Sequence, residues 1–418
     1  MSSTNTHLPR RDNGVITIEP DVVLAFLALC GLVFVPVLGS MGALMFLGAG
    51  CALLVRRLQM QVSLCLTYWY IIALPAFCLL STVWSEYPAA TFRFSLQLIA
   101  TMVIAVTIAA TTSARVFARI LFGLYSVAML ASVLFGDVRN DTGAWLGIYG
   151  SKNALAGAAA TYVIICVAQV LDSYASYRYR LLAVMGLMVG VMLLLLAQSV
   201  SALAIVPPSL MILFLLLMLY RLSALQKVTV LTFAVLAAGL MLVLLVIFSS
   251  VLFATLLETT GKDVTLTGRT DLWRIALELI AERPLLGMGY QAFWVKGHSP
   301  AEALWYRFGI DGRSGFNFHN TYLSNAVEIG IVGVFLQVVI LYGAAITTGL
   351  WALRSHRAEA ALLFILVMMI VMVSFIEVPI FFQFSLRTVI AVCAFVFAVR
   401  GLAADRSTVQ AKARLLAY

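Results

Sequence analysis

The stretch 317–333, NFHNTYLSNAVEIGIVG, places ionisable and helix-weakening residues at the start of a long apolar run. A histidine and an asparagine, His319 and Asn320, lie at its N-terminal end, and a carboxylate, Glu328, lies inside the run. A run of about 20 apolar residues is long enough to cross a bilayer as a helix. The stretch therefore predicts a membrane helix that carries packing or functional residues at one end.

The composition of the whole chain extends this prediction. Of 418 residues, 63% are hydrophobic and only 11% are charged, whereas soluble domains carry about 25% charged residues. Apolar runs recur from end to end, which indicates an all-α polytopic membrane protein. The formal charge of +9 comes from short basic clusters between these runs, so membrane topology explains it and no nucleic-acid partner is expected. The six cysteines lie in apolar runs without metal-ligand spacing, so no metal site is expected.

The hydrophobic pattern predicts about twelve transmembrane helices. They are expected near 22–38, 40–55, 64–83, 94–112, 117–136, 153–171, 181–198, 200–220, 228–253, 320–350, 360–377 and 380–399. Twelve helices put both termini on one side, where basic residues occupy every loop, and the positive-inside rule makes that side cytoplasmic. The expected parts are a cytoplasmic tail, nine helices, a periplasmic loop, three helices and a second cytoplasmic tail, at 1–21, 22–253, 254–319, 320–399 and 400–418.

The long loop 254–319 is rich in cations, although a periplasmic loop should carry few. Its cations are Lys262, Arg269, Arg274, Arg283, Lys296, Arg307 and Arg313. Loops of this length in a compact fold are usually functional or disordered. The segment 268–290 predicts a short amphipathic helix that begins with Thr270 as N-cap and ends before Pro284. Arg274 and Glu278 are expected to form a weak surface pair on it.

Three outer segments carry candidate anion-binding residues. Arg269 precedes the predicted loop helix, where free N–H groups favour an anion; the alternative is a structural or interfacial arginine. Lys152 and Asn153, in GIYGSKNALAG, stand where a helix should begin, and form either a phosphate site or an ordinary loop edge. Arg93, in STVWSEYPAATFRFS, either extends to the membrane–water interface or faces the same cavity as the other candidate residues.

The opening stretch itself admits two explanations. Histidine readily takes and gives a proton near neutral pH, so His319 is a candidate catalytic residue; the alternative is a hydrogen-bonded packing residue. Helical spacing puts Gly330 and Gly333 near the face of His319, which predicts a close-packing surface. Glu328 points the other way, and a carboxylate at that depth is expected to be buried and paired with an arginine.

The motif His319-Asn320, nine residues, then Gly330-x-x-Gly333 resembles the H[NSQ]-x9-GxxG motif of the O-antigen ligase and polysaccharide polymerase superfamily. The segment GRTDLW…ERPLLGMGYQAFW resembles the loop element of that family before its histidine, and WSEYP and SKN resemble segments of its exopolysaccharide polymerase branch. The resemblance covers the whole plan of twelve helices and one late periplasmic loop.

The resemblance implies a glycosyltransferase of the bacterial inner membrane, with its site on the periplasmic face and no metal or other cofactor. The donor would be a glycan on undecaprenyl pyrophosphate, and the acceptor a sugar hydroxyl of a lipid-linked repeat unit or of lipid A core. The bilayer, a chain-length regulator and a flippase are further expected partners. WSEYP and SKN favour a polymerase; a ligase is the alternative. A transporter is a third, disfavoured because no pair of broken spans in related halves is evident.

Carried over to this sequence, the resemblance implies that His319 is the general base and that Arg269 binds pyrophosphate. Which of Arg269, Arg283 and Arg313 matches each loop arginine of the family stays open. The remaining expected substrate-binding residues are Lys152, Asn153, Arg93, Arg283, Arg313, Asn320 and Tyr290.

Overall fold

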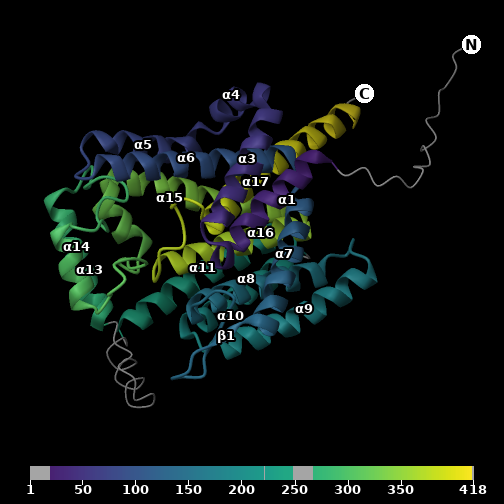
Figure 1. Cartoon of the computed structure of the whole chain (residues 1–418). Coiled ribbons are helices and arrows are strands. Elements are labelled where there is room, and N and C mark those ends of the chain that lie inside the picture. The colour runs from purple at the N-terminus through teal and green to yellow at the C-terminus, as the bar shows by residue number, and fades with distance from the viewer. Residues whose placement is uncertain (1–18, 221, 248–266, 417–418) are drawn as a thin grey trace, which may run out of the picture.

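The computed structural model describes residues 19–220, 222–247 and 267–416, which are mostly helical (Figure 1). Its helices are α1 Pro20–Val33, α2 Val35–Leu38, α3 Ser40–Arg56, α4 Leu58–Thr67, α5 Trp69–Leu80, the 3₁₀ helix η1 Ser81–Val83, α6 Pro88–Thr111, α7 Ala114–Phe135, α8 Lys152–Leu171, α9 Tyr177–Leu196, α10 Val200–Leu219, α11 Ala224–Ile247, α13 Thr267–Glu282, α14 Ser299–Arg307, α15 Thr321–Ser355, α16 Ala358–Ser374 and α17 Leu386–Leu416. The two strands β1 Asp137–Val138 and β2 Trp145–Gly147 form a hairpin that the all-α prediction did not include.

Within the described ranges, seven helices are long and apolar enough to cross a membrane: α6, α7, α8, α9, α10, α15 and the part of α17 up to Asp405. The bent pair α3 and α4 brings the total to eight if the pair is one span. Shorter apolar helices occupy Pro20–Val33, Trp69–Val83, Ala224–Ala237 and Ala358–Ser374. Every expected apolar region therefore contains helix, and the chain is an all-α polytopic membrane protein. The number twelve stays a prediction.

The single helix expected at 64–83 is wrong, because the chain breaks at Tyr68 between α4 and α5. A separate corner lies at Arg57, where α4 bends away from α3 by 98°. At this corner Arg56 Nε donates to Asp21 Oδ1 of α1 at 2.8 Å, and Arg57 also pairs with Asp21. The ion pairs hold the end of α3 against the start of α1. They fix the corner between α3 and α4.

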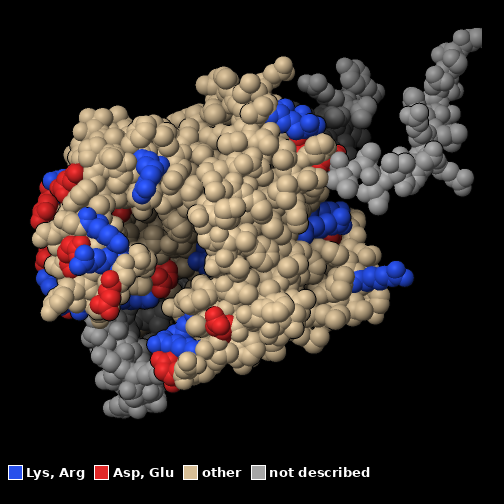
Figure 2. Space-filling model, in the orientation of Figure 1, with Lys and Arg blue, Asp and Glu red and all other residues tan. Residues whose placement is uncertain are grey.

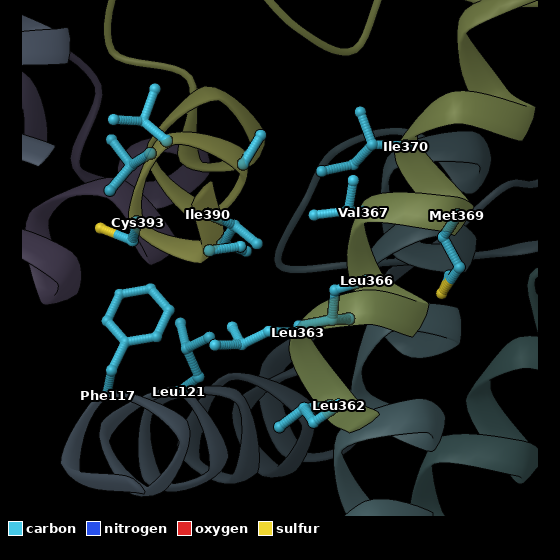
Figure 3. Packing of buried hydrophobic residues seen from close by; sticks show 14 of the residues in the cluster. Phe117, Leu121, Leu362, Leu363, Leu366, Val367, Met369, Ile370, Ile390 and Cys393 are labelled. Carbon is cyan, nitrogen blue, oxygen red and sulfur yellow. The ribbon is translucent and has the colours of Figure 1, made fainter. Parts of the chain in front are cut away.

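The centre of the bundle is a layer of aliphatic side chains between α7, α16 and α17 (Figure 3). Leu363 and Leu366 of α16 lie against Ile390 of α17, and Leu121 of α7 closes the layer; all four are at most 3% exposed. Helix α16 is apolar on all sides, as a helix surrounded by other helices must be. This layer holds α16 and α17 together, and the chain between them, 375–385, carries part of the site described below.

A second, smaller core lies in the cap formed by α13, α14 and the chain between them. Leu272 and Ala276 of α13 pack with Phe293, Trp305 of α14 and Phe318. This agrees with the predicted amphipathic helix, and Arg274 and Glu278 form the predicted i,i+4 pair at 2.6 Å. The predicted start is wrong, because α13 begins at Thr267 and so Thr270 is not its N-cap. The earlier part of the predicted loop, 254–266, lies outside the described residues.

The cap joins the bundle where α15 is broken at Gly330, which has φ 61° and ψ −173°. The break leaves backbone N–H and C=O groups of α15 without partners inside the helix. The segment after α13 forms hydrogen bonds with them. Met288 N donates to Val327 O at 3.1 Å, and Ile331 N donates to Pro284 O at 2.9 Å. A side chain at residue 330 would collide with the Leu285 carbonyl, so glycine is required here for a backbone junction.

Charged side chains gather over the cap and at the opposite end of the molecule, with a broad uncharged surface between them (Figure 2). The end of α17 and the start of α1 lie far from α13 and α14 in Figure 1. This distribution is typical of a membrane protein whose uncharged belt faces lipid.

Candidate active site

His319 lies two residues before the start of α15, in a left-handed backbone conformation with φ 48°. Asn320 is the N-cap: its Oδ1 accepts from Tyr322 N at 2.9 Å and from Leu323 N at 3.0 Å. The backbone N–H of His319 donates to Asn317 Oδ1 at 2.7 Å. The prediction that His319 shares a helical face with Gly330 is therefore wrong, because the histidine precedes the helix and the glycine interrupts it.

The His319 ring is bound by a carboxylate that sequence reasoning did not single out. Nδ1 lies 2.9 Å from Oε2 of Glu377, in the chain after α16. The other carboxylate oxygen, Oε1, accepts from Arg269 Nη2 of α13 at 2.8 Å. Three residues from three separate elements, His319, Glu377 and Arg269, thus form one hydrogen-bonded constellation.

The charges of this constellation set the tautomer of the histidine ring. Burial raises the pKa of Glu377, but the hydrogen bond from His319 and the positive charge of Arg269 outweigh burial and hold that pKa below its usual value. The carboxylate is therefore ionised at neutral pH and accepts a hydrogen bond from Nδ1–H. In the neutral imidazole this tautomer leaves the lone pair on Nε2. Nε2 can then accept a proton from a substrate.

Neighbouring hydrogen bonds hold His319 and Glu377 in position relative to each other. Thr321 Oγ1 donates to the Glu377 carbonyl at 2.9 Å, and Asn320 Nδ2 donates to the Phe375 carbonyl at 3.1 Å. Trp273 Nε1 of α13 donates to the Phe318 carbonyl at 2.8 Å. Asn320 thus has a positioning role in this structure, in addition to the substrate contact predicted for it.

A cavity of about 60 Å³ is lined in part by Glu377 and lies between α8, α10, α16 and α17. Its polar wall includes Asn153, Ser201 and Arg387, and its other residues are mainly aliphatic. Asn153 is held by Ser199, whose hydroxyl donates to Asn153 Oδ1 at 3.0 Å. Of the residues predicted in the SKN segment, the structure brings Asn153 to this cavity. The half-buried Lys152 begins α8 as expected, but it does not line the cavity.

The other predicted arginines lie outside the constellation. Arg283 pairs with Glu86 at 2.6 Å, and Arg313 pairs with Glu302 at 3.2 Å. Arg93 is exposed and lies over the ring of Phe94, 4.4 Å from its centroid. The structure does not bring these three to His319, and their substrate contacts stay predictions.

Tyr290 is fully buried and joins the cap to the bundle. Its hydroxyl donates to the Phe381 carbonyl at 3.1 Å, its N–H donates to Ser81 Oγ at 3.0 Å, and its carbonyl accepts from Thr91 Oγ1 at 2.9 Å. With both ends of the residue bound to protein, Tyr290 acts here as a packing anchor.

Glu328 is buried, as expected, but its partner is not an arginine. Its Oε2 accepts from the Gln291 N–H at 3.0 Å, and its carbonyl accepts from Gly289 N at 2.8 Å. The expected arginine pair is wrong, because the inserted segment after α13 supplies backbone N–H groups instead. Glu328 therefore belongs to the junction at Gly330, away from the carboxylate that binds the histidine.

Glu377 carried a signal in the sequence that the prediction did not use. It is the one acidic residue between 360 and 399, where two apolar regions meet. An ionisable residue in such a position usually faces the protein interior and has a function. What sequence could not show is its partner, because His319 lies 58 residues away along the chain.

Residues 183–338 match the family model described as O-antigen ligase. The chain is also 31% identical over 284 residues to a protein of Rhizobium meliloti (strain 1021) named exopolysaccharide production protein ExoQ. The chain is therefore similar to the O-antigen ligase family over these residues and to ExoQ. The alignment covers 66% of this chain and 64% of ExoQ, less than two thirds of that relative's length. Within the O-antigen ligase match lie Arg269 and His319, whereas Glu377 and Arg387 lie beyond it.

Among residues 19–220, 222–247 and 267–416, no three His, Cys, Asp or Glu side chains are grouped so that they could hold a metal ion. That the reaction needs no metal stays a prediction. Measuring turnover in the presence of EDTA tests it.

Proposed function

We propose that this protein is a polysaccharide polymerase that transfers a glycan from undecaprenyl pyrophosphate to a sugar hydroxyl of another lipid-linked repeat unit. The observation that carries the proposal is the contact between His319 Nδ1 and an ionised Glu377, which leaves Nε2 as a base. In the described part of the chain, Nε2 forms no hydrogen bond, so a substrate hydroxyl can take that position.

The proposed reaction is a single displacement. The acceptor hydroxyl gives its proton to Nε2 of His319 while its oxygen forms a bond to the anomeric carbon of the donor sugar. The bond from that carbon to the pyrophosphate oxygen breaks, and the electron pair stays on the lipid pyrophosphate. Glu377 stabilises the imidazolium that forms, because its carboxylate is already bound to Nδ1. A neighbouring guanidinium stabilises charge developing on the leaving group.

The position of the site suits a lipid-linked substrate. The constellation lies beneath the charged cap, at the outer ends of α15 and α16, and next to a cavity with mainly aliphatic walls. We propose that this face is periplasmic in the bacterial inner membrane, with both termini cytoplasmic. A chain-length regulator and a flippase are proposed partners, since a polymerase needs a supply of translocated repeat units.

The second candidate is a ligase that transfers polysaccharide to lipid A core, which the description of the matching family favours. The two functions share the base and the leaving group and differ in the acceptor. Purified protein supplied with one lipid-linked repeat unit, with and without lipid A core, separates them. A product ladder without lipid A core supports the polymerase, and transfer only onto lipid A core refutes it. No transfer in either mixture refutes both.

A further inference from the structure

Arg387, in the first turn of α17, lies at the meeting point of two cavities. It lines the cavity of about 60 Å³ next to Glu377 and a second one of about 20 Å³ between α8, α16 and α17. In the described ranges its guanidinium forms no hydrogen bond and no ion pair, although Tyr125 and Glu377 interact with its charge at longer range. A guanidinium has five N–H donors, so Arg387 has unused binding capacity inside the protein.

The charges around the cavity do not balance. Both oxygens of Glu377 are already bound, Oε1 to Arg269 and Oε2 to His319. The single negative charge of Glu377 therefore faces the positive charges of both Arg269 and Arg387. The site carries one excess positive charge even when His319 is neutral. A partly buried charge without a counter-charge is less stable than a paired one, so the site favours a bound anion.

The cavity walls show what kind of anion fits. Asn153 and Ser201 contribute polar groups to the lining, whereas Ala202, Ile205 and Met369 contribute aliphatic ones. Gly157 of α8 lies against the arginine: a Cβ there would be 2.5 Å from Arg387 Nη2. The glycine makes room for the guanidinium, which lines a space with both polar and aliphatic walls.

We propose that Arg387 binds the phosphate group of an isoprenoid pyrophosphate, with the apolar chain lying along α10 and α16. The inference rests on the proposed function and assigns the donor's anionic group to an arginine of the last helix. In this arrangement Arg269 orients Glu377, and Arg387 receives the charge that develops on the leaving group. The lipid and the catalytic histidine then lie on either side of Glu377.

The test measures binding to purified full-length protein in nanodiscs, with two probes: undecaprenyl pyrophosphate without a sugar, and inorganic pyrophosphate. Arg387→Ala should bind the lipid probe about 10–100-fold more weakly than wild type, the range expected for loss of charge-assisted hydrogen bonds. Arg387→Lys, which keeps the charge but loses the planar fork, should fall between them. The matched control is Arg274→Ala, which removes an exposed arginine of the cap and should bind like wild type.

The outcomes separate the inference from the proposed function. If wild type binds the lipid probe and Arg387→Ala binds it equally well, the inference is wrong and the function stands. If wild type does not bind the lipid probe, the proposed donor is wrong. Equal affinity of wild type for inorganic pyrophosphate and for the lipid refutes the apolar part of the site. Should Arg387→Ala not yield a monodisperse protein, Gly157→Ala decides: its methyl group displaces the guanidinium, and unchanged affinity would again refute the inference.

Discussion

Replacing Glu377 by glutamine tests the constellation with the smallest change in shape. The carboxylate accepts two hydrogen bonds, from Arg269 at 2.8 Å and from His319 Nδ1 at 2.9 Å. An amide has one acceptor oxygen, so Glu377→Gln must turn its NH₂ group toward one of the two partners. If the NH₂ faces Nδ1, the ring takes the opposite tautomer, with its proton on Nε2, and cannot act as a base.

The size of the effect follows from these contacts. Each charge-assisted hydrogen bond contributes about 1.5–3 kcal/mol, and a general base contributes about 10²–10⁴-fold to the rate. Glu377→Gln should therefore lower kcat by about 10²–10⁴-fold, whereas the KM for the lipid-linked donor should change far less, since the proposed phosphate contact is made by Arg387.

The assay is chain extension from a defined lipid-linked repeat unit by purified protein, with kcat and KM determined separately. Glu278→Gln is the matched control, because Glu278 also pairs with an arginine at 2.6 Å but on the exposed face of α13. That surface pair contributes at most about 0.5 kcal/mol, so the control should keep wild-type kinetics. Wild-type kcat in Glu377→Gln would refute the role assigned to the carboxylate.

Three further predictions concern the charge of Glu377 and the junction at Gly330. Arg269→Ala removes a positive charge that lowers the pKa of Glu377, so that pKa rises and the acid limb of the kcat–pH profile should move to higher pH; an unmoved limb with a raised donor KM would instead indicate direct pyrophosphate binding. Because the folded-state pKa of Glu377 lies below its ordinary value of 4.5, its ionisation stabilises the fold above that pH, and this stabilisation is lost as pH falls through the folded pKa. The Tm of wild type should thus fall more steeply below about pH 4.5 than that of Glu377→Gln, and parallel curves would contradict this. Gly330→Ala forces φ 61° on a residue with a Cβ that meets the Leu285 carbonyl, so it should lower stability by at least about 1–2 kcal/mol; Gly48→Ala, in open space on α3, should not, and equal Tm values would argue against the junction.

Local sequence patterns predicted the parts of the fold that depend on local physics. Apolar runs located helix in every expected region, and the apolar stripe of 268–290 predicted α13, because hydrophobic periodicity and chain breakers act within a few residues. His319 was found as a candidate because a histidine at the start of an apolar run is unusual, and it lies within residues 183–338, which match the O-antigen ligase model.

What the sequence could not show depends on residues far apart along the chain. The break at Gly330 exists because the segment 284–289 inserts its backbone there, so helical spacing counted through that position gave the wrong face. Glu377 and Arg387 are single charges in apolar regions, and only the packing of α16 and α17 against α8 and α10 brings them to one cavity. Arg269 was expected to bind a substrate anion, whereas in the structure it forms an ion pair with Glu377.

The central claim is that His319 Nε2 takes the proton of the acceptor hydroxyl. The most direct measurement is single-turnover transfer from a lipid-linked repeat unit by purified His319→Ala, whose folding is confirmed by a wild-type elution profile and by retained binding of the lipid donor. The account predicts a transfer rate about 10²–10⁴-fold below wild type with donor affinity unchanged. Transfer at the wild-type rate by this variant would contradict it.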